Sequence, residues 1–198
     1  MSVELVLGSS SPYRRAILDK LHLPYQVCKP EIDETARADE SAEQLVLRLA
    51  QQKALAVAER LNKAALIIGS DQVAVCDGMI LGKPGSEANA RQQLQRCSGK
   101  RVTFLTGLAL YHSGIQQMDS VVEPFSVEFR SLTDEEIAGY VRLEQPLNCA
   151  GSFKSEGLGI SLFTRMVGDD PNALIGLPTI RLLEMLRKHQ INPLTLAG

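Results

Sequence analysis

The sequence predicts an α/β protein built on a mixed, twisted sheet that is flanked by helices. Short apolar segments alternate with amphipathic helical segments in the first half of the chain, as in parallel strands joined by helices. Residues 101–111 and 121–129 are long strand-like segments on either side of a Ser-Gly turn, which predicts an antiparallel pair. The 198 residues, 44% of them hydrophobic, can bury a large core. We therefore expect one domain over residues 1–198, with two lobes and a cleft between them.

Each predicted element has local boundary signals. The predicted helices begin with a capping residue or a proline and carry an apolar stripe; they span residues 12–21, 41–61, 87–97, 133–143 and 178–188. The predicted strands are short apolar runs; they span residues 3–7, 25–28, 65–69, 73–75, 101–111 and 121–129. Asp77-Gly78 predicts a tight hairpin turn. The segment 30–35 is an acidic loop, and Asp71 is expected at a strand end or kink.

Composition excludes several functional classes. The net charge is −2, with both signs mixed along the chain, which does not support bulk nucleic-acid binding but is compatible with a small anionic ligand. The cysteines are widely spaced, which argues against a zinc or redox pair and favours buried free thiols; they are Cys28, Cys76, Cys97 and Cys149. The sequence contains neither a secretory leader pattern nor an apolar run long enough to span a membrane. These features predict a soluble cytoplasmic protein.

The segment 5–15 combines an apolar strand, a serine cluster and two arginines at the start of a helix. Ser11 is a good N-cap and Pro12 a good first helical residue, so free backbone N–H groups and the positive end of the helix dipole should face an anion there. Arg14 and Arg15 add positive charge. The segment therefore predicts a phosphate site, although an ordinary capped turn with exposed arginines has the same pattern.

Carboxylates and lysines elsewhere in the chain are compatible with phosphate chemistry. Asp71 follows a buried strand and is a candidate base, although a single aspartate also commonly caps a turn. If the groups converge, Arg14, Lys53 and Lys83 neutralise a polyphosphate. In that case Glu34 and Asp71 hold Mg²⁺, and Asp71 takes a proton from the attacking water. The expected chemistry is nucleotide pyrophosphatase chemistry.

A second glycine-rich segment spans residues 151–159. It has neither the Gly-Lys-Ser/Thr ending of a Walker A loop nor the spacing of a dinucleotide-binding loop. It is either a flexible turn between helix and strand or a loop whose Glu156 accepts hydrogen bonds from a base. A Gly-x-Ser-x-Gly nucleophile motif is missing from the sequence. The histidines are expected to be surface or packing residues; they are His22, His112 and His189.

Together these segments resemble the Maf family of nucleoside triphosphate pyrophosphatases over nearly the whole chain. The matching segments are Ser9-Ser10-Ser11-Pro12-Tyr13-Arg14, Asp33-Glu34, Lys53, Ser70-Asp71-Gln72, Gly82-Lys83-Pro84 and Gly151 to Gly157. The resemblance implies a fold related to inosine triphosphatases, a divalent metal (Mg²⁺ or Mn²⁺), a possible homodimer and Asp71 as the proton acceptor. The residues that it implies for substrate binding are Ser9, Ser11, Tyr13, Arg14, Lys53, Gln72, Lys83 and Glu156.

Two departures from the commonest family pattern concern the substrate. Tyr13 and Glu156 resemble the YceF-like branch of the family, which is associated with 7-methyl-GTP. Methylation at N7 makes guanine cationic, so an aromatic face contributes about 0.5–2 kcal/mol by cation–π contact. A carboxylate accepts the N1 and N2 protons of guanine, which thymine and uracil do not present in that arrangement. The alternatives are that Tyr13 packs on the sheet and that Glu156 is a solvated loop charge.

These inferences predict a hydrolase that converts 7-methyl-GTP to 7-methyl-GMP and pyrophosphate. A near alternative is the same reaction on dTTP or UTP. An alternative of a different class is a nucleotide-binding regulator of septum formation without turnover, which the history of the Maf family suggests. Binding of capped RNA is less favoured because only 5% of residues are aromatic and no basic stripe is evident. The expected partner is therefore a small nucleotide, with no nucleic acid and no membrane.

Overall fold

A computed structural model describes residues 3–195 of the chain. The strands are β1 (Glu4–Gly8), β2 (Gln26–Val27), β3 (Ala65–Cys76), β4 (Met79–Leu81), β5 (Arg101–His112), β6 (Gln117–Phe129) and β7 (Phe163–Val167). The α-helices are α1 (Pro12–Asp19), α2 (Ala42–Leu61), α3 (Glu87–Cys97), α4 (Asp134–Glu144), α5 (Pro171–Ile175) and α6 (Thr179–Lys188). Two short 3₁₀ helices are η1 (Ala150–Ser152) and η2 (Leu158–Leu162).

The strands form one mixed sheet of seven strands, which confirms the predicted fold class. Its order is β2-β1-β3-β5-β6-β7, and β4 pairs with β3. Strand β1 is parallel to both β2 and β3, whereas the β3–β4 and β6–β7 pairs are antiparallel. The β3–β4 turn has Asp77 and Gly78 at φ of 49° and 76°, as a tight hairpin with two left-handed residues requires. The predicted Asp-Gly hairpin is therefore confirmed.

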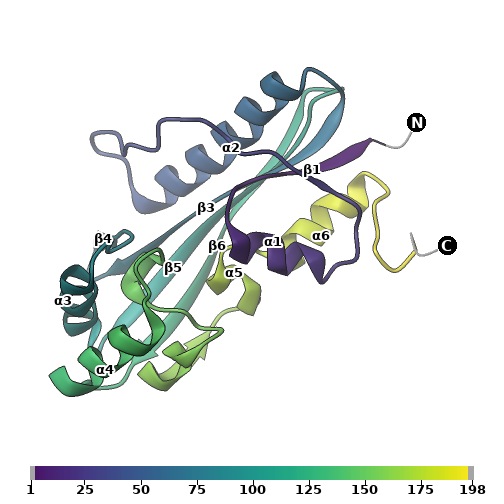
Figure 1. Cartoon of the computed structure of the whole chain (residues 1–198). Coiled ribbons are helices and arrows are strands. Elements are labelled where there is room, and N and C mark those ends of the chain that lie inside the picture. The colour runs from purple at the N-terminus through teal and green to yellow at the C-terminus, as the bar shows by residue number, and fades with distance from the viewer. Residues whose placement is uncertain (1–2, 196–198) are drawn as a thin grey trace. The chain divides into compact units, whose positions relative to one another are not determined.

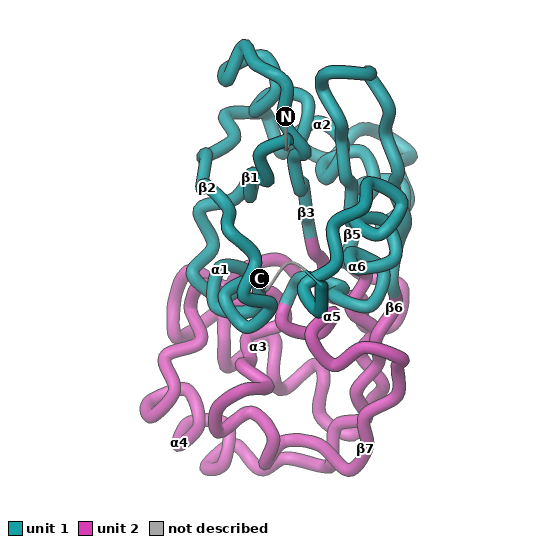
Figure 2. The backbone as a smooth tube through the Cα atoms, turned by 90° about the vertical axis from the view of Figure 1, so that its right-hand side faces the viewer, with its two compact units in different colours: residues 1–71, 106–123, 176–198 teal, residues 72–105, 124–175 magenta. Residues whose placement is uncertain are grey.

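The chain divides into two compact units, coloured separately in Figure 2. Unit 1 contains residues 1–71, 106–123 and 176–198, and unit 2 contains residues 72–105 and 124–175. The long strands β3, β5 and β6 contribute residues to both units.

In unit 1, helix α2 lies against the strands in unusually close contact (Figure 1). A Cβ atom at Gly69 would lie 2.0 Å from the carbonyl oxygen of Ala50, and one at Gly107 would lie 2.1 Å from that of Val46. Only glycine permits this approach, because the helix backbone fills the space of any side chain. The fully buried apolar residues of one core cluster in unit 1 are small or β-branched; they are Val6, Ala50, Ala54, Val57, Ala65, Ile67 and Ala109.

The core of unit 2 contains four phenylalanine rings in edge-to-face contact. The ring of Phe153 lies 5.0, 5.8 and 4.8 Å from those of Phe104, Phe129 and Phe163, measured between centroids. Such edge-to-face contacts contribute about 0.5–1.5 kcal/mol each beyond the burial of apolar area. Helices α3 and α4 cover this core. The aromatic cluster thereby anchors the start of the glycine-rich segment at Phe153.

The helix boundaries follow the predicted capping residues. Ser11 Oγ accepts a hydrogen bond from the backbone N–H of Arg14, with Pro12 at the first helical position of α1. Complete capping boxes open α2 at Ser41 and α4 at Thr133. Ser86 caps α3. Because a capping side chain satisfies otherwise unpaired backbone N–H groups, these starts were readable from sequence.

Several strand and helix predictions were wrong or incomplete. Strand β3 is continuous from Ala65 to Cys76, so Asp71 lies within the strand rather than at its end. The strand continues because its polar residues have partners: Ser70 Oγ, for example, donates to a carbonyl oxygen at 2.9 Å. Strand β2 has only two residues, and β7 and α5 were not predicted at all.

The glycine-rich segment is more ordered than a flexible turn. Gly151, Ser152 and Phe153 are buried, and η1 and η2 occupy much of residues 150–162. Glu144 holds the segment through bonds to the Lys154 ammonium and to the backbone N–H of Leu158. Of the two interpretations that the sequence left open, a simple flexible turn does not describe this segment, because Phe153 packs into the aromatic core.

All four cysteines are free thiols, as predicted. Cys76 and Cys97 are buried, and burial raises the pKa of the Cys97 thiol to about 12. Cys28 and Cys149 are half-buried, so for these two the prediction of burial was only partly correct. His112 and His189 pack against each other with ring centroids 5.4 Å apart, in agreement with a packing role.

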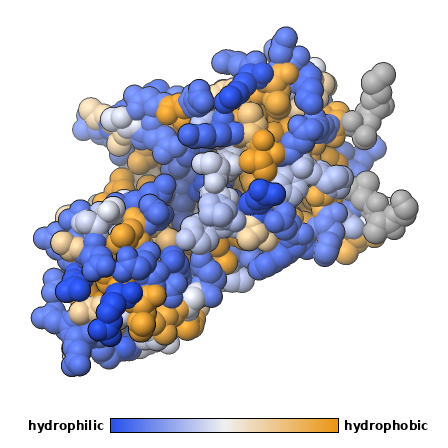
Figure 3. Space-filling view, viewed as in Figure 1, coloured by the Kyte–Doolittle hydropathy of each residue, from blue (hydrophilic) through white to orange (hydrophobic). Residues whose placement is uncertain are grey.

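Hydrophilic residues cover most of the face seen in Figure 3, and hydrophobic residues appear there in separate groups. Within residues 3–195, none of the helices combines the length and the hydropathy needed to span a bilayer.

Candidate active site

The charged centre of unit 1 is the ammonium group of Lys53. Its Nζ atom lies 2.7 Å from Asp71 Oδ1 and 2.8 Å from Glu34 Oε1. The Lys53 side chain is 8% exposed and that of Asp71 is 13% exposed, whereas that of Glu34 is 57% exposed. The structure thus brings together three predicted site residues from a helix, a strand and the acidic loop.

The close packing of α2 on β3 explains why Lys53 reaches Asp71. Gly69 lies two residues before Asp71, and its missing side chain allows α2 to approach at Ala50 and Ala54. Lys53 lies between these two alanines in sequence, on the part of α2 that Gly69 allows to approach β3. A buried ammonium requires a paired anion, and Asp71 on the same strand supplies it.

Arg14 on α1 is a second cation of this centre. Its Nε donates to the carbonyl oxygen of Gly176 at 2.7 Å, and its Nη1 donates to Ser9 Oγ at 3.4 Å. Burial lowers the pKa of Arg14, and the nearby charges of Asp71 and Glu34 oppose this effect. Among the described residues Arg14 forms no direct ion pair with a carboxylate. A desolvated guanidinium with unused N–H donors is a favourable place for an oxyanion.

Ser70 and Gly176 are site residues that sequence analysis missed. The carbonyl oxygen of Gly176 accepts both from Arg14 Nε at 2.7 Å and from Ser70 Oγ at 2.9 Å. This oxygen therefore links the start of α1 to the strand that carries Asp71. Ser70 is next to Asp71 in the sequence, but no local signal connects Ser70 or Arg14 with Gly176, which lies more than a hundred positions away.

The serines before and at the start of α1 have structural roles. Ser9 is buried, and its Oγ accepts from the backbone N–H of Ser11 at 3.1 Å as well as from Arg14. Ser11 caps α1, as predicted. Tyr13 lies in the first turn of the same helix and is half-buried. Ser9, Ser11 and Arg14 thus form one hydrogen-bonded loop at the N-terminus of α1.

The remaining predicted residues belong to unit 2. Gln72 Nε2 donates to the carbonyl oxygens of Ala173 at 2.7 Å and Leu174 at 3.2 Å, so this amide group fixes α5. Lys83 follows β4 and is exposed. Glu156 is exposed on the glycine-rich segment and accepts from Ser155 Oγ at 3.4 Å.

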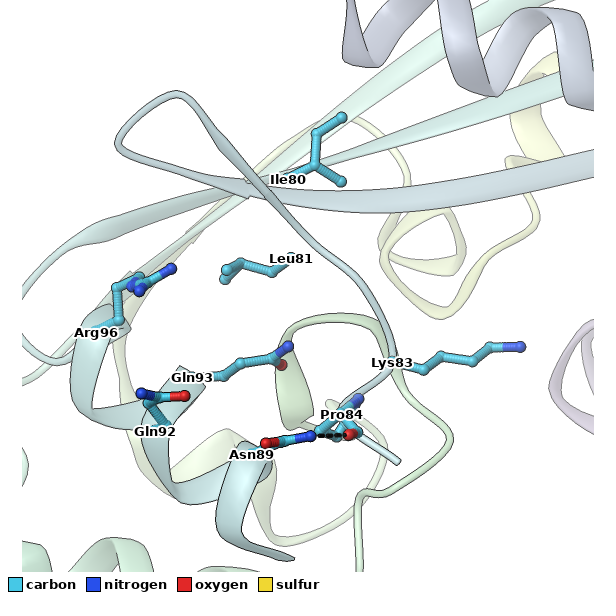
Figure 4. A pocket seen from close by; sticks show the side chains of 8 residues that line it. All are labelled: Ile80, Leu81, Lys83, Pro84, Asn89, Gln92, Gln93 and Arg96. Atoms are coloured by element: carbon cyan, nitrogen blue, oxygen red, sulfur yellow. Dashed lines mark hydrogen bonds between the residues drawn. The ribbon is translucent and has the colours of Figure 1, made fainter. Parts of the chain in front are cut away.

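Lys83 lies at the border of a small pocket of unit 2, with a volume of about 210 Å³ (Figure 4). In this view its side chain extends away from the other lining residues. The pocket lies between β4 and α3; its lining residues are Ile80, Leu81, Lys83, Pro84, Asn89, Gln92, Gln93 and Arg96.

Glu34 and Asp71 offer carboxylate oxygens, which are suitable ligands for a magnesium ion whose other ligands come from the substrate and water. Both carboxylates contact the same Lys53 nitrogen, so they lie close enough to share one cation. A cluster of three or more acidic, histidine or cysteine ligands is not found within residues 3–195. Mg²⁺ is commonly bound by one or two carboxylates together with waters and substrate phosphates. The two carboxylates therefore fit a metal that arrives with a nucleotide.

Comparison with known proteins places the chain in a family. The family model described as "Maf-like protein" matches residues 4–189. The chain belongs to the Maf family. One relative of this Maf protein is the 7-methyl-GTP pyrophosphatase of Idiomarina loihiensis, which is 63% identical over 195 residues. That match covers 98% of this chain and 98% of the relative.

Solved structures with similarity to this Maf protein are more distant. The Ham1 protein of Staphylococcus aureus has a TM-score of 0.49 and 16% identity, over 95% of this chain and 100% of its own. A nucleoside-triphosphatase / dITP/XTP pyrophosphatase of Mycobacterium abscessus has a TM-score of 0.46 and 14% identity, over 99% of both chains.

Proposed function

We propose that this Maf protein hydrolyses 7-methyl-GTP to 7-methyl-GMP and pyrophosphate. The observation that carries the proposal is the charged centre of unit 1, where Lys53 joins Asp71 and Glu34 beside the desolvated Arg14. A relative with 63% identity over nearly the full length bears the name of this activity, which supports the choice of substrate.

In the proposed reaction a water oxygen attacks the α-phosphorus, and the bond between this phosphorus and the oxygen bridging to the β-phosphorus breaks. Asp71 accepts the proton of the attacking water through a carboxylate oxygen. Arg14 and Lys53 offset the negative charge of the phosphates, and Arg14 offers forked N–H donors to their oxygens. Pyrophosphate leaves with the electron pair of the broken bond.

Glu34 and Asp71 would hold a divalent cation, Mg²⁺ or Mn²⁺. Such an ion supplies Lewis-acid stabilisation of phosphate charge when it is bound. Lys53 holds the two carboxylates together without substrate, because their like charges would otherwise repel each other.

The remaining predicted residues are proposed to bind the nucleotide. Tyr13 stacks on the cationic 7-methylguanine ring, and Glu156 accepts its N1 and N2 protons. Lys83 contacts phosphate. The other proposed substrate-binding residues are Ser9, Ser11 and Gln72. We further propose a cytoplasmic, single-domain protein of residues 1–198 that forms a homodimer and binds neither nucleic acid nor membranes.

The reaction is tested by pyrophosphate release from 7-methyl-GTP, GTP, UTP and dTTP in the presence of Mg²⁺. The Asp71→Asn variant should lose about 10²-fold or more of the rate, as expected for removal of a general base. Asp77→Asn is a matched control. Asp77 lies on the β3–β4 hairpin of unit 2, and its half-exposed carboxylate is paired with the ammonium group of Lys100. If folded Asp71→Asn protein keeps most of the rate, Asp71 is not the base.

The substrate panel separates the proposal from its alternatives. Preference for 7-methyl-GTP supports the roles of Tyr13 and Glu156, and Glu156→Gln should then weaken the preference over UTP. If the protein prefers UTP or dTTP, the proposed reaction stands, but the base contacts of Tyr13 and Glu156 are wrong. Tight nucleotide binding with no release above the Asp71→Asn background favours a regulator without turnover.

A further inference from the structure

Gln93 on α3 is the side chain that joins two separate segments of unit 2. Its Nε2 donates to the carbonyl oxygen of Gly82 at 3.2 Å, directly before Lys83. Its Oε1 accepts from Ser152 Oγ at 2.5 Å, at the start of the glycine-rich segment. One amide group thus uses both its donor and its acceptor side, and each contact ends on a segment that carries a proposed nucleotide-binding residue.

The first contact belongs to a set of bonds that fixes the backbone around Lys83. Asn89, one helical turn before Gln93, donates from Nδ2 to the carbonyl oxygen of Pro84 at 2.9 Å (Figure 4). The carbonyl groups on both sides of Lys83 are therefore held by amides of α3. The Lys83 side chain itself extends away from these amides in Figure 4. Helix α3 thus fixes the backbone from which the ammonium group extends, while leaving the ammonium group accessible.

The second contact secures an unfavourable backbone conformation. Ser152 is fully buried and has a φ of 62°, directly after Gly151 with a φ of 70°. Gly151 and Ser152 are thus two successive left-handed residues before Phe153, and serine adopts this region only at a cost that other contacts must offset. The bond to Gln93 is such a contact. It determines where the segment toward Glu156 begins.

We infer that Gln93 is a positioning residue that sets both the phosphate contact of Lys83 and the base contact of Glu156. This inference rests on the proposed function, in which Lys83 and Glu156 bind the nucleotide. Gln93 is not a catalytic residue, because within residues 3–195 the hydrogen bonds of its amide join it to Gly82 and Ser152. It acts on the KM for nucleotides through Gly82 and on the choice of base through Ser152.

Three substitutions separate the two contacts. Gln93→Leu removes both. Gln93→Glu keeps an acceptor for Ser152 but places a negative charge against the Gly82 carbonyl oxygen. Ser152→Ala removes only the second contact. The control is Gln92→Leu, since Gln92 directly precedes Gln93 on α3, is exposed, and makes no side-chain hydrogen bond within residues 3–195.

The expected kinetic effects differ between the variants. Gln93→Leu should raise the KM for 7-methyl-GTP about fivefold to tenfold and lower the ratio of kcat/KM for 7-methyl-GTP over UTP by a similar factor. Gln93→Glu should raise the KM for both nucleotides and leave that ratio unchanged. Ser152→Ala should lower the ratio with little change in the KM for UTP. Gln92→Leu should match the native protein.

A double-mutant cycle tests whether Gln93 acts through Lys83. The KM effect of Gln93→Glu should disappear in the Lys83→Met background, because the phosphate contact that Gln93 positions is then absent. A KM effect that persists undiminished in the Lys83→Met protein overturns the inference, since it would show a general loss of structure. The urea unfolding midpoint of each variant is measured alongside.

Two further outcomes distinguish this inference from the proposed function. If Lys83→Met and Glu156→Gln leave KM and the nucleotide ratio unchanged, the proposed nucleotide contacts are wrong, and the inference about Gln93 falls with them. If those two variants impair the protein and Gln93→Leu behaves as Gln92→Leu, the inference alone is wrong. Amide hydrogen exchange gives a readout without turnover: Gln93→Leu, but not Gln92→Leu, should accelerate exchange in residues 151–159.

Discussion

Replacing Gly69 with alanine tests the packing that brings Lys53 to Asp71. The added Cβ would lie 2.0 Å from the carbonyl oxygen of Ala50, where comfortable contact is about 3.5 Å. Because the obstructing atom belongs to the helix backbone, α2 must move away from β3 by about 1.5 Å to relieve the contact. Overpacking of this kind costs about 3 kcal/mol at the upper end of its usual range.

The assays are urea denaturation, which gives the free energy of unfolding, and thermal denaturation, which gives Tm, each followed by far-ultraviolet circular dichroism. For a chain of this length, a loss of about 3 kcal/mol should lower Tm by about 6–12 °C. Gly139→Ala is the control, because Gly139 lies in α4 with no atom near its missing Cβ, and alanine there should stabilise the helix by about 0.5–1 kcal/mol. A Gly69→Ala protein within about 0.5 kcal/mol of the native stability would refute the packing argument.

The same displacement should impair catalysis, because Lys53 lies on α2 and Asp71 on β3. A shift of about 1 Å at a reacting centre can cost about 10²-fold in rate. The variant is therefore assayed for pyrophosphate release at a temperature where it is still folded. A normal rate in a destabilised protein would show that the Lys53–Asp71 contact tolerates movement of the helix.

Two further predictions concern charged groups of unit 1. Lys53→Met should lower the free energy of unfolding by about 3 kcal/mol, mostly because Asp71 is left unpaired, since Glu34 is well exposed. The same variant should have no turnover. Urea unfolding and the rate assay check these two effects, and native stability would contradict the role of the Lys53–Asp71 pair. Hydrogen bonding from Arg48 lowers the pKa of Glu40 from 4.5 to about 2, so its stabilisation is present above pH 4.5 and is lost as the pH falls toward 2. Urea unfolding at several pH values should show a steeper loss over this window in the native protein than in Glu40→Gln, and parallel curves would contradict this linkage.

Local signals predicted the helices well. Ser11, Ser41, Ser86 and Thr133 all cap helices in the structure, because capping depends on a bond between residues three positions apart. The Asp77-Gly78 turn was predictable for the same reason, since its φ angles are a property of two neighbouring residues.

Elements that depend on distant partners were predicted less well. Strand β7 pairs with β6 from more than thirty residues away, and its alternation is too short to be recognised in sequence. A flexible turn was one of two interpretations of the glycine-rich segment, whereas in the structure Phe153 and Glu144 hold this segment through residues that are far apart in the sequence. The residues next to Phe153 and Glu144 in the sequence do not indicate these contacts.

The sequence by itself determined the types of residue available for chemistry: a serine-capped helix with Arg14, two carboxylates and Lys53. Their convergence on one centre in unit 1 was decided by the tertiary structure, since it requires α2 to approach β3 at Gly69. The same holds for the carbonyl oxygen of Gly176, which joins Arg14 to Ser70. A chain pattern encodes neighbours along the backbone, whereas these contacts exist only because the packed core brings distant segments within hydrogen-bonding distance.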